Sequence, residues 1–288
     1  MKNIRSIATV ATVSLLSALP FSAQGQTAIQ TEIEEVLVSA SLLPIAASRS
    51  ANAITVIDSE QLKNRAALSV SDLLRDEPGL AVSRSGVQGS ATQIRVRGAE
   101  ANHLLVLIDG VEANDPSQSD ELNWGTLSAA DIERIEVIRG PQSAMRGSDA
   151  MAGVVNIITR RADQPLSASL FTETGSFGTS NSGFSVGSKQ GDFDGRLGVN
   201  HIETEGENIS RTGSEKDGYQ NTNVNLNAGW TVSDELRLSF AARQSDGMNE
   251  FDADSDFDGF VDDQDKVSEF RNSTMRVQGD YVSADGRF

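Results

Sequence analysis

Residues 254–265 carry acidic side chains at the spacing of a calcium-binding loop. They read DSDFDGFVDDQD, with a glycine at the position where such a loop turns sharply. The predicted ligands are the carboxylates of Asp254, Asp256, Asp258, Asp262 and Asp265 and the backbone carbonyl of Phe260. From residue 246 to residue 265 there are nine acids and no base, so the segment repels itself unless a cation binds. We therefore expect Ca²⁺ here; the alternative is a solvated acidic loop.

The segments on either side of this loop predict strands, not the helices of an EF-hand. Apolar residues alternate with polar ones before the loop, at Leu236, Leu238 and Phe240, and again after it, at Met275, Val277 and Tyr281. The calcium loop is therefore expected at the tip of a β-hairpin.

Period-two patterning continues through the whole second half of the chain. We expect six strands, at about 167–175, 180–190, 193–204, 221–232, 235–245 and 269–283. Tight turns at 191–192 and 233–234 alternate with long acidic connections at 205–220 and 246–268. Outer-membrane barrels show this asymmetry, with short turns on the periplasmic side and long loops outside.

The segment 51–162 has a different texture, typical of a small α+β domain. Strands are expected at 53–58, 80–83, 93–97, 104–108, 134–138 and 154–159, and short helices at 59–65 and after Ser69. The runs LLVLI and VVNII are continuously apolar, which predicts strands buried on both faces.

The first 25 residues have the pattern of a secretory signal peptide, with Lys2 and Arg5 before an apolar run. Residues 26–50 then read as a flexible arm that carries one strand-forming motif, EEVLVSAS. A net charge of −17 argues against nucleic-acid binding, and the chain has no cysteine with which to form disulfides. No nucleophile, base or phosphate-cradling motif indicates an enzyme; His103 and His201 lie far apart and are interpreted as structural.

Two long blocks, IRVRGAEANHLLVLIDGV and ADIERIEVIRGPQSAMRGSDAMAGVVNIITRR, resemble the plug domain of TonB-dependent outer-membrane receptors. The likeness covers residues 34–288 and is closest to the cobalamin receptors, which order their outer loops with calcium. Arg146 departs from the family pattern, which has an aromatic residue before the glycine. The resemblance implies an α+β plug followed by the first strands of an antiparallel transmembrane β-barrel, and it adds Asp217 to the residues near the metal.

The resemblance also implies partners for the arm and the plug. The motif at Glu35, Val36, Leu37, Val38 and Ser39 is similar to the TonB box, which adds a strand to the energy transducer. The apical plug turns imply a floor for the substrate at Ser90, Thr92, Asn114 and Ser117.

A plug that fills a polar barrel must also present charge to the wall. The residues expected to do so are Arg97, Glu133, Glu136 and Arg139; the alternative is that they form routine surface pairs.

The layout expected is a signal peptide (1–25), an arm (26–50), a plug (51–162) and about six barrel strands (163–288). Residues 166–288 are too few for the 22 strands or so that the family requires, so the chain is interpreted as an N-terminal fragment. The expected function is energy-coupled uptake of cobalamin across the outer membrane. The alternatives are a siderophore receptor and a calcium-dependent adhesion module.

Overall fold

The computed structural model describes residues 37–38, 45–46, 52–65, 67–211 and 213–283. The predicted signal peptide and most of the arm, including Glu35, Val36 and Ser39, lie outside the described residues. The rest of the predicted TonB box, β1 (Leu37–Val38), pairs antiparallel with β2 (Ile45–Ala46). Pairing of this kind shows that Leu37 and Val38 adopt extended backbone.

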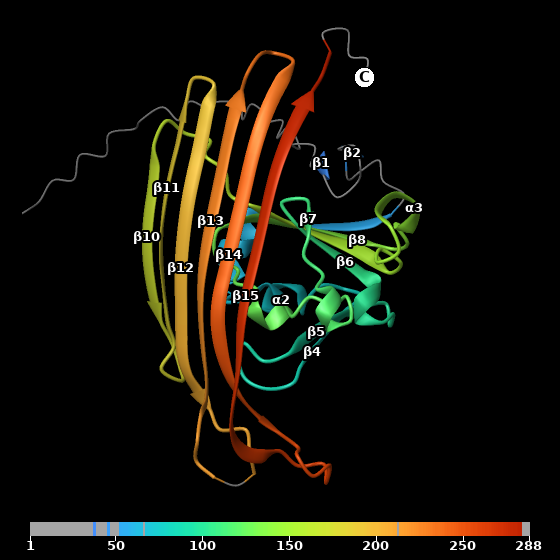
Figure 1. Cartoon of the computed structure of the whole chain (residues 1–288), viewed down its shortest axis with the longest axis vertical. Coiled ribbons are helices and arrows are strands. Elements are labelled where there is room, and N and C mark those ends of the chain that lie inside the picture. The colour runs from blue at the N-terminus through green and yellow to red at the C-terminus, as the bar shows by residue number, and fades with distance from the viewer. Residues whose placement is uncertain (1–36, 39–44, 47–51, 66, 212, 284–288) are drawn as a thin grey trace, which may run out of the picture. The chain divides into compact units, whose positions relative to one another are not determined.

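A mixed five-stranded sheet forms the centre of the first domain, in the order β3-β8-β9-β6-β7 (Figure 1). Its strands are β3 (Ala53–Ile57), β6 (Leu104–Ile108), β7 (Val111–Glu112), β8 (Ile132–Arg139) and β9 (Gly153–Thr159). The strands β6 and β9 pair in parallel and all other pairs are antiparallel. A separate hairpin pairs β4 (Leu80–Arg84) with β5 (Thr92–Val96).

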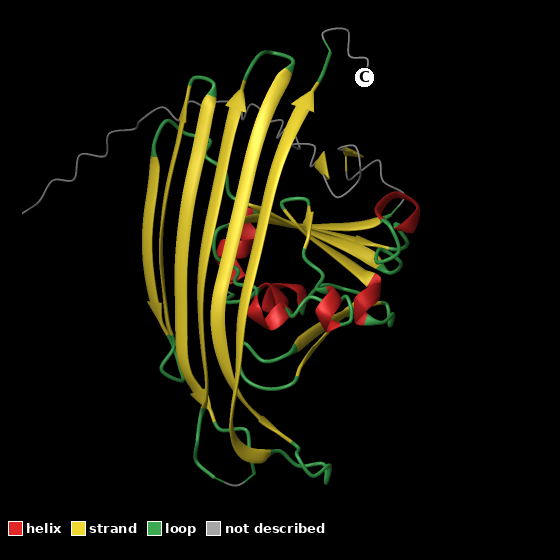
Figure 2. Ribbon diagram, viewed as in Figure 1, coloured by secondary structure: helices red, strands yellow, loops and turns green. Residues whose placement is uncertain are grey.

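Short helices complete this domain. They are α1 (Ser59–Arg65), α2 (Val70–Leu74), α3 (Ser143–Arg146) and the 3₁₀ turns η2 (Ala101–His103), η3 (Pro116–Gln118) and η4 (Trp124–Thr126) (Figure 2). Ser69 caps α2 as predicted, since its side chain accepts a hydrogen bond from the Asp72 amide. The strand β6 is buried along its whole length, as its apolar run predicts.

The second sheet is an antiparallel meander in sequence order. Its strands are β10 (Ser167–Thr174), β11 (Ser180–Gln190), β12 (Phe193–Glu207), β13 (Asp217–Thr231), β14 (Leu236–Ala253) and β15 (Asp262–Tyr281). The six predicted strands are therefore all present. The connections 208–216 and 254–261 are shorter than expected, because β12 to β15 continue into segments that were predicted to be loop.

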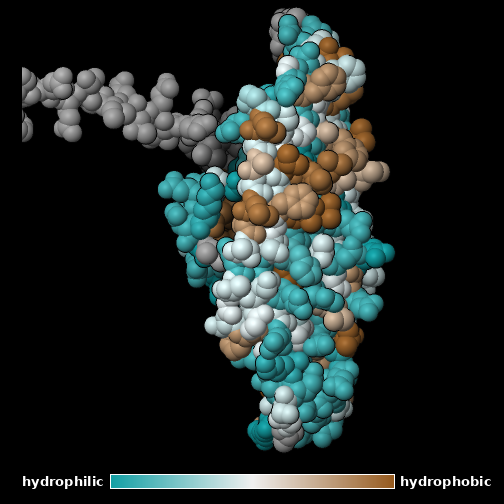
Figure 3. Space-filling view, turned by 90° about the vertical axis from the view of Figure 1, so that its left-hand side faces the viewer, coloured by the Kyte–Doolittle hydropathy of each residue, from teal (hydrophilic) through white to brown (hydrophobic). Residues whose placement is uncertain are grey.

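The two faces of this sheet differ in the way a barrel wall requires. On β13 every second residue is buried, and four of these are asparagines: Asn221, Asn223, Asn225 and Asn227. Most of the intervening residues, among them Val224, Leu226 and Trp230, are exposed. Figure 3 shows apolar side chains gathered on the half of the outer surface near the tight turns, with a polar surface on the other half. Apolar residues outside and polar residues inside indicate lipid on one face and the first domain on the other.

Hydrogen bonds from the asparagine face hold the two domains together. Asn221 donates to the carbonyl of Thr126 (2.8 Å), and Asn227 donates to the hydroxyl of Thr159 (2.7 Å). Arg276 of β15 donates to the carbonyl of Asp109. No helix in the described ranges is long and apolar enough to span a membrane.

Candidate metal and ligand site

The predicted calcium residues lie at the tip of the β14–β15 hairpin, but they separate into two groups. The side chains of Asp254, Asp256 and Asp258 place carboxylate oxygens within 4.8 Å of one another. They close the turn themselves: Asp254 accepts hydrogen bonds from the amides of Asp258 (3.1 Å) and Gly259 (2.9 Å). This group is largely exposed.

The other predicted carboxylate ligands, Asp262 and Asp265, do not join this group. The carboxylate of Asp262 accepts a hydrogen bond from the Ser255 amide. The ring of Phe260 lies against the Arg211 guanidinium, whose central carbon is 3.2 Å from the centre of the ring. Asp265 instead lies close enough to Glu215 for its charge to raise the pKa of that carboxyl group, after the larger effect of burial. The loop thus has fewer converging ligands than its spacing predicts.

A second acidic group forms where β13, β14 and β15 meet the loops. Glu215, Asp252 and Asp263 place oxygens within 4.8 Å of one another. Asp217 begins β13 beside them with 0% of its surface exposed, and Asp252 is 8% exposed. Among these side chains, both oxygens of Asp217, one oxygen of Asp252 and one oxygen of Glu215 accept no hydrogen bond from the described residues. A buried carboxylate without a donor is costly, so either a proton or a cation would stabilise this group.

The surroundings of Asp217 disfavour its charged form. Burial, together with the charges of Asp252, Glu250 and Asp263, raises the pKa of Asp217 to about 6. The backbone amide of Ile209 approaches Asp217 without meeting the geometry of a hydrogen bond, and it offsets this increase only in part. Asp217 begins β13 and precedes the exposed apolar residues of that strand, Val224, Leu226 and Trp230. Several oxygen ligands without a nitrogen or sulfur ligand suit a hard cation such as Ca²⁺.

Local backbone features bring these acids together. The β12–β13 register shifts between Thr204 and Glu207, and the β14–β15 register shifts between Phe251 and Ala253. Such bulges redirect side chains at the end of a ladder. The sequence indicates Asp217 only by resemblance and does not single out Glu215, Asp252 and Asp263, because their approach depends on a strand register that spacing along one loop cannot reveal.

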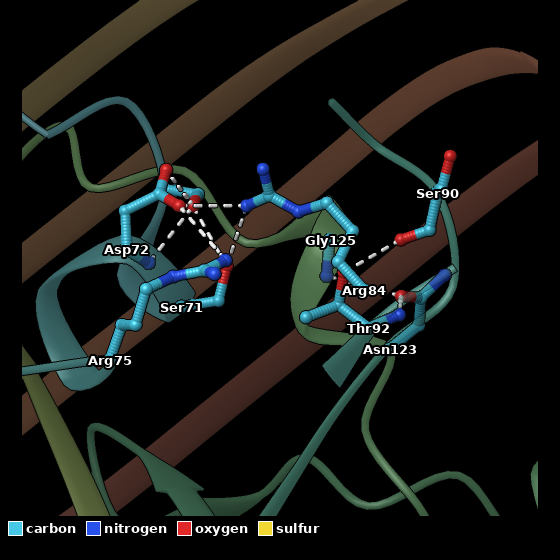
Figure 4. A network of polar contacts seen from close by, with 9 residues as sticks. Ser71, Asp72, Arg75, Arg84, Ser90, Thr92, Asn123 and Gly125 are labelled. Carbon is cyan, nitrogen blue, oxygen red and sulfur yellow. Dashed lines mark hydrogen bonds and ion pairs between the residues drawn. The ribbon is translucent and has the colours of Figure 1, made fainter. Parts of the chain in front are cut away.

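The predicted substrate floor is only partly open. Ser90 and Thr92 are each 2% exposed, and the hydroxyl of Thr92 donates to the carbonyl of Ser90 (2.8 Å). Figure 4 shows Thr92 between Ser90 and Asn123, so the side chains of Ser90 and Thr92 are packed inside the turn and do not face a ligand in this conformation. Because both side chains are buried, contact between a ligand and Ser90 or Thr92 stays a prediction.

The other two predicted floor residues lie elsewhere. The side chain of Ser117 is exposed and donates to Asp115. Asn114 lines a cavity of about 310 Å³ between the first domain and strands β14 and β15, whose polar wall includes Arg243, Ser245 and Arg271. The amide of Asn114 is engaged with the backbone of Leu104 and Val106. The cavity therefore has a mixed lining, in which the Asn114 side chain is held by the backbone of the first domain.

Three of the four charged residues that were expected to face the barrel wall form contacts within the first domain. Glu133 and Glu136 pair with Arg134, within one strand of the first domain, and Arg139 donates to Pro78 and Thr55. The backbone carbonyl of Gly79 accepts a hydrogen bond from the Arg97 amide. An ion pair that does join the domains is formed by Arg196 and Asp131 (2.8 Å), both largely buried, and sequence analysis did not name it.

Comparison with known families assigns the first domain. The profile of the TonB-dependent Receptor Plug Domain matches residues 46–154. This segment is a TonB-dependent receptor plug. The chain is 28% identical over 300 aligned positions to the vitamin B12 transporter BtuB of Vibrio vulnificus. That alignment covers 98% of this chain and 48% of the transporter, so the chain spans about half the length of this relative.

Solved receptors share the arrangement of plug and strands. The ferric yersiniabactin uptake receptor FyuA of Yersinia pestis matches with a TM-score of 0.64 at 21% identity, over 82% of this chain and 40% of the receptor. The ferripyoverdine receptor of the Pseudomonas aeruginosa outer membrane matches with a TM-score of 0.70 at 16% identity, over 87% and 35%. The six-stranded sheet behind the plug therefore has the fold with which the barrels of these receptors begin.

Proposed function

We propose that this chain is the plug and first barrel wall of a TonB-dependent outer-membrane receptor that takes up cobalamin, with outer loops ordered by Ca²⁺. The likeness to a vitamin B12 transporter along nearly the whole chain supports the ligand. The observation that supports a metal ion is the buried side chain of Asp217. It lies beside Glu215, Asp252 and Asp263, and neither of its oxygens accepts a hydrogen bond from the described residues.

The residues of this chain suggest how calcium acts. Asp217 and Glu215 belong to the β12–β13 connection and the start of β13, while Asp252 and Asp263 belong to the ends of β14 and β15. One cation bound by all four would link the two loops, which already touch through Arg211 and Phe260. Ordering the loops before substrate arrives removes an entropic cost from substrate binding.

The exposed group at Asp254, Asp256 and Asp258 supplies a second place for a cation, as the loop spacing predicts. The energy for release of the substrate would come from a TonB-type transducer that binds the segment 35–39. In this proposal the plug fills the barrel lumen until the transducer pulls on the arm.

A siderophore receptor is the second candidate, because solved receptors for ferric siderophores share this fold. The test is a titration of the full-length protein in detergent with cobalamin and with ferric siderophores, each with Ca²⁺ and with a chelator. We expect cobalamin to bind, with an affinity that drops at least tenfold in chelator.

Matched variants separate the metal from the general charge of the protein. Asp217→Asn should reproduce the effect of chelator, whereas Asp234→Asn, in a tight turn at the opposite end of the sheet, should leave the affinity unchanged. Binding of a siderophore without cobalamin would select the second candidate, and a cobalamin affinity indifferent to Ca²⁺ would remove the proposed role of the acidic group.

A further inference from the structure

The acidic group is connected to the apical turn of the plug through one strand. Asp217 and Tyr219 are two residues apart on β13 and both face inward, with Tyr219 4% exposed. The Tyr219 ring lies directly against Gly89 of the plug, so closely that a methyl group at position 89 would overlap the ring. Tyr219 is itself held in place, because its hydroxyl accepts a hydrogen bond from Asn221 (2.9 Å).

The loop that carries Glu215 makes a second contact with the same turn. The tip of the Ile209 side chain lies 3.4 Å from the place that a Cβ atom on Gly86 would occupy. Residues 209 and 219, which precede and follow Glu215 and Asp217 in the sequence, therefore both lie against the plug turn 86–91. Gly218, between Asp217 and Tyr219, donates its amide to Glu250 (2.8 Å).

The plug turn 86–91 also packs closely against Gly125 of the plug. The carbonyl of Ser90 lies so close to Gly125 that a Cβ there would overlap it. The side chain of Asn123 accepts hydrogen bonds from the amides of Thr92 (3.2 Å) and Gly125 (3.1 Å), which fixes that side of the turn (Figure 4). A displacement of Tyr219 must therefore move the turn or be resisted by it.

We propose that cation occupancy at the acidic group and the conformation of the plug turn 86–91 are thermodynamically coupled through Tyr219 and Ile209. The coupling rests on the proposed metal site. Without a cation, the carboxylates of Glu215, Asp217, Asp252 and Asp263 repel one another and push the ends of β13 and β14 apart. A cation draws them together and sets Tyr219 against Gly89, so the state of the outer loops reaches the plug.

Coupling of this kind is reciprocal, so a change in the plug turn must alter cation affinity. Gly89→Ala adds a methyl group against the Tyr219 ring without touching any acid. Its matched control is Gly98→Ala, which places alanine at nearly the same left-handed backbone (φ +80° against +86°) with no atom within 4 Å. Both variants carry similar backbone strain, and only the first displaces Tyr219.

The measurement is calorimetric titration of the full-length protein and its variants with Ca²⁺. We expect Gly89→Ala to weaken Ca²⁺ binding by about tenfold, within the usual range of coupling between sites, and Gly98→Ala to match the wild type. Equal affinities in all three proteins would overturn the coupling. A wild type that binds no Ca²⁺ at these acids would overturn the metal site itself, which is a distinguishable result.

Hydrogen exchange of the wild type gives a test that needs no variant. Addition of Ca²⁺ should slow exchange of the amides in the turn 86–91, which lies in the plug, and leave the amides of β6 unchanged. Exchange in the turn that is the same with Ca²⁺ and with chelator would contradict the coupling even where Gly89→Ala fails to fold.

Discussion

A single carboxylate, that of Asp217, explains much of the proposed chemistry. It is fully buried, accepts no hydrogen bond from the described residues and lies among other acids. A group in that position is stabilised either by a proton or by a metal ion. The choice between these two depends on pH, which makes the metal site testable without knowledge of the substrate.

We predict that Ca²⁺ affinity falls as pH decreases through about 6. The pKa of Asp217 is raised to about 6 from an ordinary 3.8, so the proton is bound below that pH and competes with the cation. Affinity should be nearly constant above pH 7 and fall by about tenfold per pH unit well below 6. Calorimetry between about pH 7.5 and pH 5 measures this slope, and a constant affinity over the range is the contrary result.

The same shift has the opposite effect on the metal-free protein. Because the folded state holds its proton more tightly than the unfolded state, the contribution of Asp217 to stability is complete below pH 4 and is lost as pH rises through 6. Thermal unfolding in chelator should therefore show a melting temperature that decreases over this interval. Saturating Ca²⁺ should abolish the decrease; an equal slope with Ca²⁺ contradicts the account.

At the scale of elements, the sequence predicted the strands well and their ends poorly. The period-two pattern located all six barrel strands, since apolar outer residues such as Val224 and Leu226 alternate with Asn223 and Asn225. Beyond the apolar band apolar residues are few, so the extensions of β14 and β15 into 246–253 and 262–268 carry only a weak hydrophobic signal. The approach of Asp252 and Asp263 depends on those extensions and was missed for that reason.

The two domains should behave differently when separated. The buried apolar clusters lie within the plug, among them Ile57, Leu73, Val106 and Ile135, so a segment 51–162 has its own core and is expected to fold alone. The sheet has its apolar residues outside and polar residues inside. A segment 166–288 is expected to aggregate without detergent, because its open edges and lipid-facing surface are unprotected.

Circular dichroism and light scattering of the two segments check this prediction. The plug should unfold cooperatively as a monomer. If the 166–288 segment were instead soluble, monomeric and cooperatively folded, the sheet would be a water-soluble domain and the barrel interpretation would be wrong.

At the scale of the whole molecule, the orientation of the sheet links the two ends of the proposed transport cycle. The acidic group and the loops 208–216 and 254–261 lie at one end, and the tight turns lie at the other. In a barrel of this kind long loops face outward, so the proposed metal site would lie where substrate arrives. The arm motif at 35–39 precedes the plug and would reach the transducer on the opposite side of the membrane.

Energy-coupled uptake through this arm is the central claim, and one experiment tests it most directly. Leu37→Pro removes a backbone donor and fixes φ in the segment that would add a strand to the transducer. Ala28→Pro makes the same change in the arm outside the motif. Uptake of labelled cobalamin is measured in bacterial cells that lack their own receptor and express the full-length protein or either variant. We predict that Leu37→Pro binds cobalamin normally and takes up almost none, while Ala28→Pro transports like the wild type; undiminished uptake by Leu37→Pro would contradict the account.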